Sequence, residues 1–319
     1  DTVRLAQATD ALGFKRFWVA EHHSSRSLVG TSPEILVERI LSATSRIRVG
    51  SGGVLLSHYS PLKVAEQFRV LDSLHPDRVD LGIGRAPGGS THVAEALANP
   101  RPVARAEDFD QQIGDLAGFL HGTMKDTHAY FDIHLQPGPL SATTPEIWLL
   151  GSSDVSARLA AKYGLAYAYA DFFGDIRDRG PGIAKMYRDS YSPSAFQPEP
   201  KLMIALQVLC APTDAEAEFL GASRNLNKAG GGVGGLPYGL LHPQAALEYP
   251  RNEESIRWET QFRAGYIDGT PEKVKERILE VVDLYEADEA SIVTITHSTE
   301  HKIRSYALIS EAFGLAAVL

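Results

Sequence analysis

The chain lacks the features that mark secreted or membrane-spanning proteins. Its 319 residues include a single cysteine, Cys210, so no internal disulfide can form, and this usage is typical of a reducing compartment. No apolar run reaches the roughly 18 residues that a membrane span needs, and no charged and apolar leader precedes the first helical pattern. These absences predict a cytoplasmic protein with no membrane partner.

An excess of basic residues is also absent. The formal net charge is −9, the isoelectric point is near 5.7, and no basic block is interleaved with aromatic residues. This argues against nucleic acid as a partner. Any phosphate group on a ligand must therefore be bound by a few local side chains. Hydrophobic residues make up 44% of the chain, which is enough for a sizeable core.

Apolar strand-like runs alternate with amphipathic helical patterns along almost the whole chain. Seven strands are expected, near residues 17, 50, 81, 148, 168, 206 and 292. Strands separated by helices form a parallel sheet covered by helices, and this length suits one α/β domain, residues 1–319, with the fold of a (β/α)₈ TIM barrel. Because the chain enters directly into a helical pattern, we expect the first barrel strand to be missing from this sequence.

A glycine-rich segment interrupts this pattern in the last third of the chain. Residues 229–239 read AGGGVGGLPYG, and such a composition favours a loop over packed structure. We therefore expect a mobile loop at residues 225–262. Its functional interpretation is a lid.

Two strands flanking one helix, within residues 46–89, end in loops of unusual composition. Gly52 and Gly53 interrupt the first strand, which predicts a bulge or a place where a flat group lies close to the backbone. The second strand ends at Arg85, beside several glycines. A cation in such a flexible loop is suited to binding an anion.

The active site of a barrel lies at the carboxyl ends of its strands, where two further groups of polar residues are expected. Glu21, His22 and His23 follow the first strand. Neighbouring strand residues point to opposite faces, so the two histidines are not expected to share a metal ion, and we predict no metal site. One histidine is a candidate general base or hydrogen-bond donor, and a histidine hydrogen-bonded into the barrel wall is the structural alternative.

The second group comprises Ser152, Ser153 and Ser156, at the start of an expected helix. Serine hydroxyls and helix N–H groups together bind phosphate monoesters, although serines also cap helices for purely structural reasons. The presence of Arg85 at another strand end favours the phosphate interpretation. The glycines after residue 81 do not have the spacing of a dinucleotide-binding fingerprint.

Six segments, in the same order along the chain, resemble the bacterial-luciferase-like flavin-dependent monooxygenases: FWVAEHH, RIRVGSGGVLL, SPLKVAEQFRVLDSL, VDLGIGRAPG, IWLLGSS and TITH. The resemblance implies a barrel that binds reduced FMN as a co-substrate at the carboxyl ends of its strands. It also implies a homodimer, a separate flavin reductase, and transfer of oxygen from O₂ to a small organic substrate through a flavin peroxide. The missing strand would precede Asp1.

The resemblance also assigns roles to particular residues. Arg85, Ser152, Ser153 and Ser156 fall at positions that bind the FMN phosphate, although luciferase has an acidic residue at the first serine. Gly52 and Gly53 fall where the family has a non-proline cis peptide beneath the flavin ring. His22 matches a catalytic base, and His23 is its neighbour.

Gly84 stands where luciferase has a reactive cysteine, so the resemblance does not imply light emission. Two other functions remain open from the sequence. Related families on this scaffold include deazaflavin-dependent reductases, and a non-catalytic flavin-binding relative is a further alternative. The substrate itself is not predicted.

Overall fold

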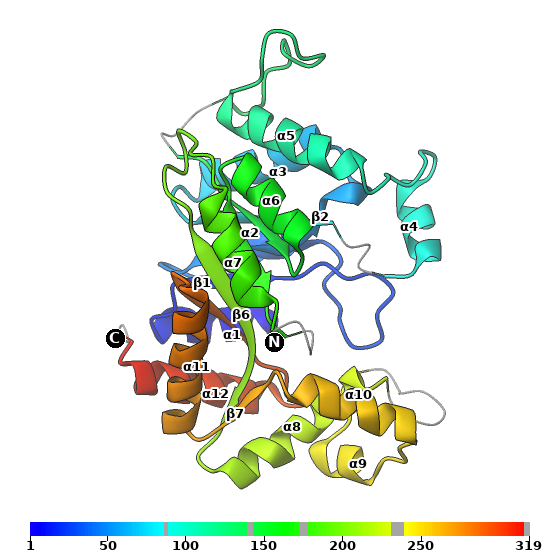
Figure 1. Cartoon of the computed structure of the whole chain (residues 1–319), viewed down its shortest axis with the longest axis vertical. Helices are drawn as coiled ribbons and strands as arrows, with labels where there is room; N and C mark the ends of the chain where they lie inside the picture. Colours follow the sequence, from blue (N-terminus) through cyan, green and yellow to red (C-terminus); the bar gives the residue numbers. More distant parts are fainter. Residues whose placement is uncertain (86–88, 139–142, 173–177, 231–238, 316–319) are drawn as a thin grey trace.

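Seven strands form one curved, wholly parallel sheet at the centre of the computed structural model (Figure 1), which describes residues 1–85, 89–138, 143–172, 178–230 and 239–315. The strands are β1 (Arg16–Val19), β2 (Arg48–Leu55), β3 (Val79–Gly84), β4 (Glu146–Gly151), β5 (Ala166–Ala170), β6 (Leu202–Cys210) and β8 (Glu289–Val293). Each pairs with the next in this order. All seven lie where the sequence predicts them, and the α/β barrel fold is confirmed.

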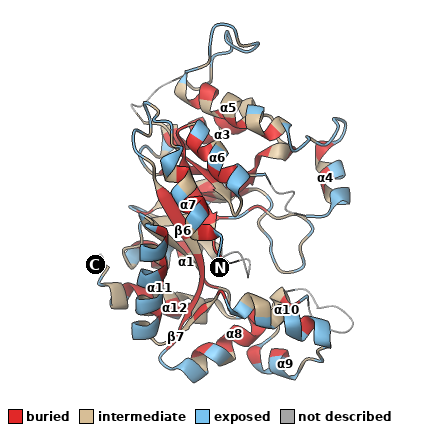
Figure 2. Ribbon diagram, viewed as in Figure 1, coloured by how far each residue is buried: buried red, intermediate tan, exposed pale blue. Residues whose placement is uncertain are grey.

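Helices cover the outer face of this sheet. They are α1 (Thr2–Ala11), α2 (Pro33–Leu41), α3 (Pro61–Leu74), α5 (Asp108–His121), α6 (Asp154–Lys162), α7 (Gly180–Asp189), α11 (Pro271–Tyr285) and α12 (Thr299–Phe313), with α4 (Thr91–Ala98) following β3. Figure 2 shows mostly buried strands beneath helices whose outer faces are exposed. The core lies between the layers, where outward-facing strand residues such as Leu81 and Leu149 are fully buried with helix residues such as Phe68 and Ile113. None of the described helices has the length and apolar character of a membrane span.

The sheet is open between β1 and β8. No backbone pairing joins these two strands within the described residues, and the gap lies where the expected first strand would pair. Side chains bridge the gap instead, because Arg16 Nε donates to Glu289 Oε2 over 2.7 Å. Outside the gap, Ser310 Oγ on α12 donates to the carbonyl oxygen of Leu12, just after α1, over 2.7 Å.

The segment after β6 differs from the expected loop. The expected loop, residues 225–262, begins within helix α8 (Asp214–Lys228). It also contains α9 (Pro243–Glu248) and nearly all of α10 (Glu253–Arg263). Leu226 of α8 packs with Ala246 of α9, so part of this segment is packed structure. The glycine-rich residues 231–238 lie outside the described residues, and a mobile lid stays a prediction.

An additional short strand, β7 (Ile267–Gly269), was not predicted from the sequence. It pairs with the carboxyl end of β6, where Cys210 is opposite Gly269, beyond the barrel itself. Its three residues between two helices are too few to show a strand periodicity.

Inside the barrel, the end from which the strands start is filled by charged and aromatic side chains. Arg16 lies there with its side chain 7% exposed, and its Nη1 pairs with Asp80 over 2.7 Å. Burial alone would raise the pKa of Glu289, but hydrogen bonds from Arg16 and Lys15 outweigh it and lower that pKa to about 2. Above this layer, Trp18 and Trp148 pack edge to face with their ring centroids 5.5 Å apart. Asp80 and Trp148 are fully buried, so this end of the barrel is packed, and we expect a ligand at the carboxyl ends of the strands.

Candidate functional site

The carboxyl end of the barrel is lined by small residues that remain accessible. The interior side of the sheet is identified by the cluster of Trp148, Ala166, Ala168 and Met203. Strand alternation then places Ala20, Gly52, Gly84, Leu150, Ala170 and Ala205 on the same side, nearer the carboxyl ends. All six are partly or fully exposed, whereas Trp148 and Met203 below them are buried. A hollow therefore lies above the tryptophans.

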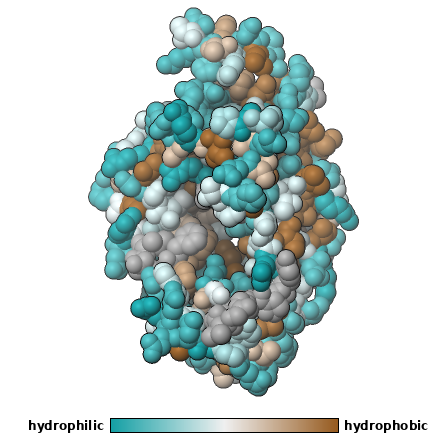
Figure 3. Space-filling view, turned by 90° about the vertical axis from the view of Figure 1, so that its right-hand side faces the viewer, coloured by the Kyte–Doolittle hydropathy of each residue, from teal (hydrophilic) through white to brown (hydrophobic). Residues whose placement is uncertain are grey.

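The same hollow is visible from the outside. The loop after β1 and helix α4, which follows β3 along the chain, lie on the right-hand side of Figure 1. Figure 3 views the molecule from that side and shows a hollow near the middle, with hydrophobic residues inside it. The hollow is open to solvent on the face where the sequence places its candidate residues.

Gly52 and Gly53 lie at a break in the register of β2. Pairing with β3 shifts between Gly52 and Val54, so the expected bulge is confirmed. The Gly52–Gly53 peptide bond is cis, as the family resemblance implies. A Cβ atom on Gly53 would lie 2.6 Å from the carbonyl oxygen of Gly82, which is closer than real contacts allow, so the adjacent strand requires glycine here.

Glu21 is the centre of a buried hydrogen-bond network beside this bulge. It is 2% exposed, and its carboxylate accepts hydrogen bonds from the backbone N–H of Leu55 at 2.9 Å and from the hydroxyl of Tyr59 at 2.6 Å. Nε2 of His23 lies 2.7 Å from the same carboxylate. Burial, followed by the hydrogen bond to Glu21, raises the pKa of Tyr59, so this phenol stays protonated. The network holds His23 by a hydrogen bond, as the structural alternative describes, and a catalytic role for His23 stays a prediction.

His22 occupies different surroundings. Its backbone N–H donates to the carbonyl of Gly30 at 2.7 Å, which holds the loop, and its side chain is half-buried. Burial lowers the pKa of His22, and the positive charge of Lys228 lowers it further. The imidazole is therefore neutral at neutral pH and able to accept a proton. No group of three possible metal ligands occurs among the described residues.

Arg85 directly follows β3, and its side chain is exposed. The hydroxyl of Ser57 donates to its carbonyl oxygen over 3.4 Å, which links the loop to the segment after β2. Within the described part of the chain, the guanidinium group of Arg85 forms no ion pair or hydrogen bond with another side chain. An anionic ligand can therefore use it without displacing a partner.

The three serines at the start of α6 differ from one another. Ser153 is the N-cap, and its Oγ accepts from the backbone N–H of Ser156 at 3.4 Å. Ser156 is buried, and its hydroxyl donates to the carbonyl of Ser153 at 2.8 Å and lies 3.1 Å from the hydroxyl of Tyr167. Ser152 and Ser153 are partly exposed. Ser152 and Ser153 thus remain accessible at the helix N-terminus, while the buried Ser156 stabilises the turn through its hydrogen bond to Ser153.

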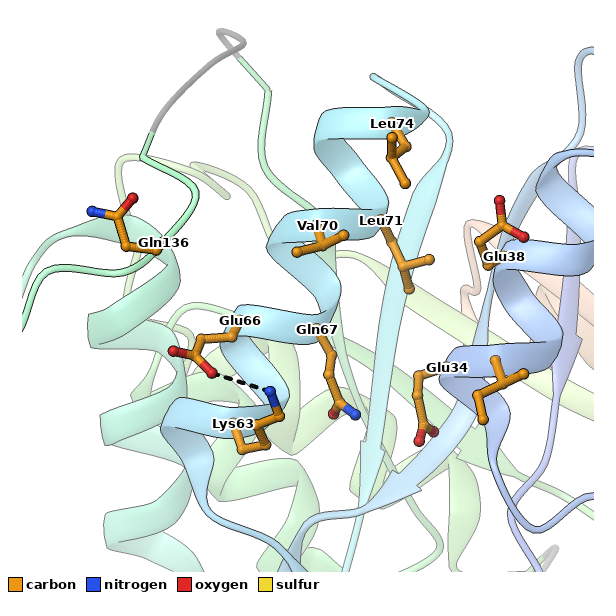
Figure 4. Close-up of a pocket in the computed structure, with 10 residues that line it drawn as sticks. Glu34, Glu38, Lys63, Glu66, Gln67, Val70, Leu71, Leu74 and Gln136 are labelled. Atoms are coloured by element: carbon orange, nitrogen blue, oxygen red, sulfur yellow. Dashed lines mark hydrogen bonds and ion pairs between the residues drawn. The ribbon is translucent and has the colours of Figure 1, made fainter.

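Two further hollows lie on the surface. One, of about 340 Å³, is on the outside of the barrel between α2 and α3 (Figure 4) and includes Ile35, Leu71 and Leu74. The other, of about 470 Å³, lies between the end of α8 and α10 and includes Lys228 and Trp258. The second adjoins the functional end, since Lys228 acts electrostatically on His22.

Sequence reasoning missed the structural role of Glu21 and did not identify Lys228 as a site residue. Glu21 was noticed in the Glu-His-His run, but its role depends on contacts with Leu55 and Tyr59, which lie more than thirty residues away. Lys228 is the last residue of α8, and the C-terminus of a helix favours a cation. A sequence prediction that ended this helix at residue 228 would have identified it.

Comparisons with known proteins agree with this architecture. A family model described as luciferase-like monooxygenase matches residues 1–286. The uncharacterized protein YwcH of Bacillus subtilis (strain 168) is 44% identical, over 98% of this chain and 92% of that protein. The N-acetyl-S-alkylcysteine monooxygenase of the same organism is 35% identical, over 98% and 91%. The crystal structure of apo-MsnO8 superposes with a TM-score of 0.86 at 35% identity, covering 99% of this chain and 93% of the other.

More distant structures share the fold. The oxygenating constituent of 3,6-diketocamphane monooxygenase from Pseudomonas putida, in complex with FMN, has a TM-score of 0.68 at 18% identity, over 100% and 93% of the chains. An F420-dependent secondary alcohol dehydrogenase has a TM-score of 0.67 at 13% identity, over 97% and 93%. At these identities the likeness concerns the fold alone. From the family model and the relatives above 30% identity, the chain belongs to the luciferase-like monooxygenase family and is a flavin-dependent oxidoreductase.

Proposed function

We propose that this protein uses reduced FMN, supplied by a separate reductase, and O₂ to oxygenate a small organic substrate. The observation that carries the proposal is the accessible hollow at the carboxyl end of the barrel, lined by Gly52, Gly84, Ala170 and Ala205. Small side chains leave room for a flat ring system, and the two tryptophans beneath close its floor. The residues present therefore fit a flavin. When bound and reduced, FMN supplies the activation of O₂ and the transfer of an oxygen atom.

The phosphate of FMN is assigned to Arg85, Ser152, Ser153 and the N-terminus of α6. Arg85 offers a guanidinium group without a described partner, and the helix N-terminus offers backbone N–H groups and a favourable dipole. Ser156, a further candidate, would act indirectly through its hydrogen bond to Ser153. Because the net charge of the chain is negative, a phosphate must be bound by a few local groups, and these residues supply them.

The two histidines have separate roles in this proposal. Neutral His22 takes a proton from the reacting centre or returns one, because burial and Lys228 keep its pKa low. His23, held by Glu21, orients the wall of the pocket beside the Gly52–Gly53 bulge. Flavin and substrate that fill the hollow would limit the access of water to the reaction.

A sulfur-containing substrate is one candidate, because a relative with 35% identity is named N-acetyl-S-alkylcysteine monooxygenase. A deazaflavin-dependent reductase is the second candidate function. It is supported by the shared fold of an F420-dependent alcohol dehydrogenase. The two functions differ in whether O₂ is consumed.

We further propose that the protein forms a homodimer through the groove between α2 and α3. Ile35 and Leu74 are 69% and 61% exposed there, although both are large and apolar. The groove also carries Glu34, Glu38 and Lys63, of which Lys63 pairs with Glu66 over 3.3 Å (Figure 4). A twofold copy would cover the apolar residues and bring carboxylates and ammonium groups of both subunits into one self-complementary interface.

Oxygen uptake tests the proposed function. The protein is mixed with reduced FMN and a panel of thioethers, ketones and aldehydes, and substrate-dependent uptake and product oxygenation are recorded. Replacing His22 with alanine should lower turnover by roughly 10²-fold while leaving FMN affinity unchanged. Hydride transfer from reduced deazaflavin without O₂ uptake would instead establish the second candidate function, and unchanged turnover in the His22 variant would remove its catalytic role.

A further inference from the structure

The 470 Å³ cavity between the end of α8 and α10 adjoins the barrel mouth, but the flavin and its phosphate are assigned to other residues. Lys228 forms one side of it, and Trp258 and Phe262 of α10 form another. Asn252, the N-cap of α10, also lines the cavity. The hollow thus combines a cation with an aromatic surface.

Lys228 is a half-buried cation that lacks an acidic partner. No ion pair joins its ammonium group to any carboxylate within the described residues, including the exposed Glu254 at the rim of the same cavity. Its Nζ lies 6.0 Å from the centre of the Phe172 ring, after β5. Burial, and then the charge of Arg224, lowers the pKa of Lys228. An anion brought into the cavity would offset the cost of placing this charge away from water.

The aromatic wall is accessible despite its size. Trp258 is 43% exposed, and its ring stacks on Phe262 with centroids 5.9 Å apart and an angle of 25° between the planes. Stacked rings present a broad, rigid apolar surface at little conformational cost. Such a surface suits the hydrocarbon or aromatic part of a small molecule.

The cavity is fixed next to the site that carries His22. Arg224, one turn before Lys228, is fully buried, donates to Asp268 at 3.0 Å and lies over the ring of Tyr266 at 4.1 Å, so α8 is anchored to β7. Asn227 lies 3.5 Å from the hydroxyl of Ser27, in the loop that follows His22 and His23. A molecule held by Lys228 therefore lies beside the barrel mouth.

We propose that this cavity binds the substrate as an organic acid, with the ammonium group of Lys228 pairing with its carboxylate and Trp258 and Phe262 covering its apolar part. The inference rests on the proposed function, because it names the substrate class of the same site. It requires only binding, and it can be tested without flavin, oxygen or turnover.

The test uses 4-phenylbutyrate and its neutral analogue 4-phenylbutan-1-ol as probes. Of the three tryptophans in the chain, Trp18 and Trp148 lie inside the barrel, so fluorescence changes on binding should come from Trp258 and be lost in Trp258→Phe. The carboxylate should bind about tenfold more tightly than the alcohol. Lys228→Met should abolish that preference and leave alcohol binding within about twofold, whereas Lys228→Arg should retain the preference. Lys302→Met, at another half-buried lysine on α12, is the matched control and should behave as wild type.

Four results would overturn the proposal. The first three are equal binding of the two probes by the wild type, no binding of either, and an equal loss of both in Lys228→Met. A fourth is a fall in affinity for FMN but not for riboflavin in Lys228→Met, which would assign the cation to the flavin phosphate. None of these results depends on monooxygenase turnover, so failure of this inference and failure of the proposed function can be told apart.

Discussion

The carboxylate of Glu21 lies 2.7 Å from Nε2 of His23 and also accepts hydrogen bonds from Leu55 and Tyr59. Because an ionised carboxylate can only accept hydrogen bonds, Nε2 of His23 is the donor in this pair. The arrangement ties the first strand end to the segment after β2. In the proposed mechanism Glu21 is a positioning residue, and its neighbour His22 is the candidate that acts on protons.

Replacing Glu21 with glutamine should weaken this network without changing its shape. An amide retains an oxygen acceptor but presents N–H groups to at least one donor, so we expect a loss of about 1–3 kcal/mol in the free energy of unfolding. The ring of His23 should also change tautomer, which nitrogen-15 NMR of the imidazole detects. Tyr59→Phe, which removes one donor only, is the control and should cost less. An unchanged tautomer in the Glu21 variant would show that the carboxylate does not set the state of His23.

Replacing Arg85 with alanine should distinguish the phosphate from the ring of the flavin. Loss of a charge-assisted contact predicts an affinity for FMN lower by about 10- to 100-fold, with riboflavin binding changed by less than about twofold. Arg277→Ala, at an exposed arginine of α11, provides the control. Equal losses for FMN and riboflavin would contradict the assignment of Arg85 to the phosphate.

Introducing charge into the groove between α2 and α3 should dissociate the proposed dimer. Ile35→Asp together with Leu74→Asp would place like charges against each other across a twofold axis, so we expect monomers at micromolar protein in sedimentation velocity. Leu284→Asp, at a 55% exposed leucine of α11, is the matched control and should leave the dimer intact. A dimer that survives the double change, or a wild-type monomer, would place the interface elsewhere or remove it.

The ring of His121 stacks on that of Phe196, with centroids 3.7 Å apart. Because this ring is buried, the free energy of unfolding should depend on pH. Burial, followed by the charge of Arg69, lowers the pKa of His121 from 6.5 to about 4. Between these values the unfolded chain binds more protons than the folded one, so the stabilisation is present above pH 6.5 and is lost as pH falls towards 4. Urea unfolding should show a smaller fall over this window in His121→Phe than in wild type. Parallel curves for the two proteins would contradict the shift.

Much of the fold was predictable because it depends on local patterns. The seven barrel strands are continuous apolar runs, and proline at the start of α2, α3 and α11 marks where these helices begin. The glycine pair at 52 and 53 was detectable because glycine is unusual inside a strand, and the structure shows Trp18 close to Gly52 and β3 close to Gly53.

The rest depends on contacts that no local pattern records. Because the residues after 229 are rich in glycine, the loop was predicted to begin at residue 225, within the last turn of α8. Lys228 was therefore not recognised as a site residue. The serines at the start of α6 look equivalent in the sequence, but only the distance of 3.1 Å between Ser156 and Tyr167 shows that one of them faces into the fold. The network of Glu21 likewise joins residues from separate strand ends.

The most direct test of the flavin site is to fill the hollow at the carboxyl end of the barrel. A Cβ atom on Gly84 would make only an ordinary contact, 3.9 Å from Leu55 Cδ2, so Gly84→Leu should fold while its side chain occupies the space assigned to the ring. Gly138→Leu is the control, because a Cβ atom there would meet no atom of the described residues within 4 Å apart from its chain neighbours. Binding of reduced FMN, titrated without oxygen, should fall by at least about 100-fold in Gly84→Leu and stay unchanged in Gly138→Leu. Wild-type affinity in a folded Gly84→Leu protein would contradict a flavin bound in the mouth of this barrel.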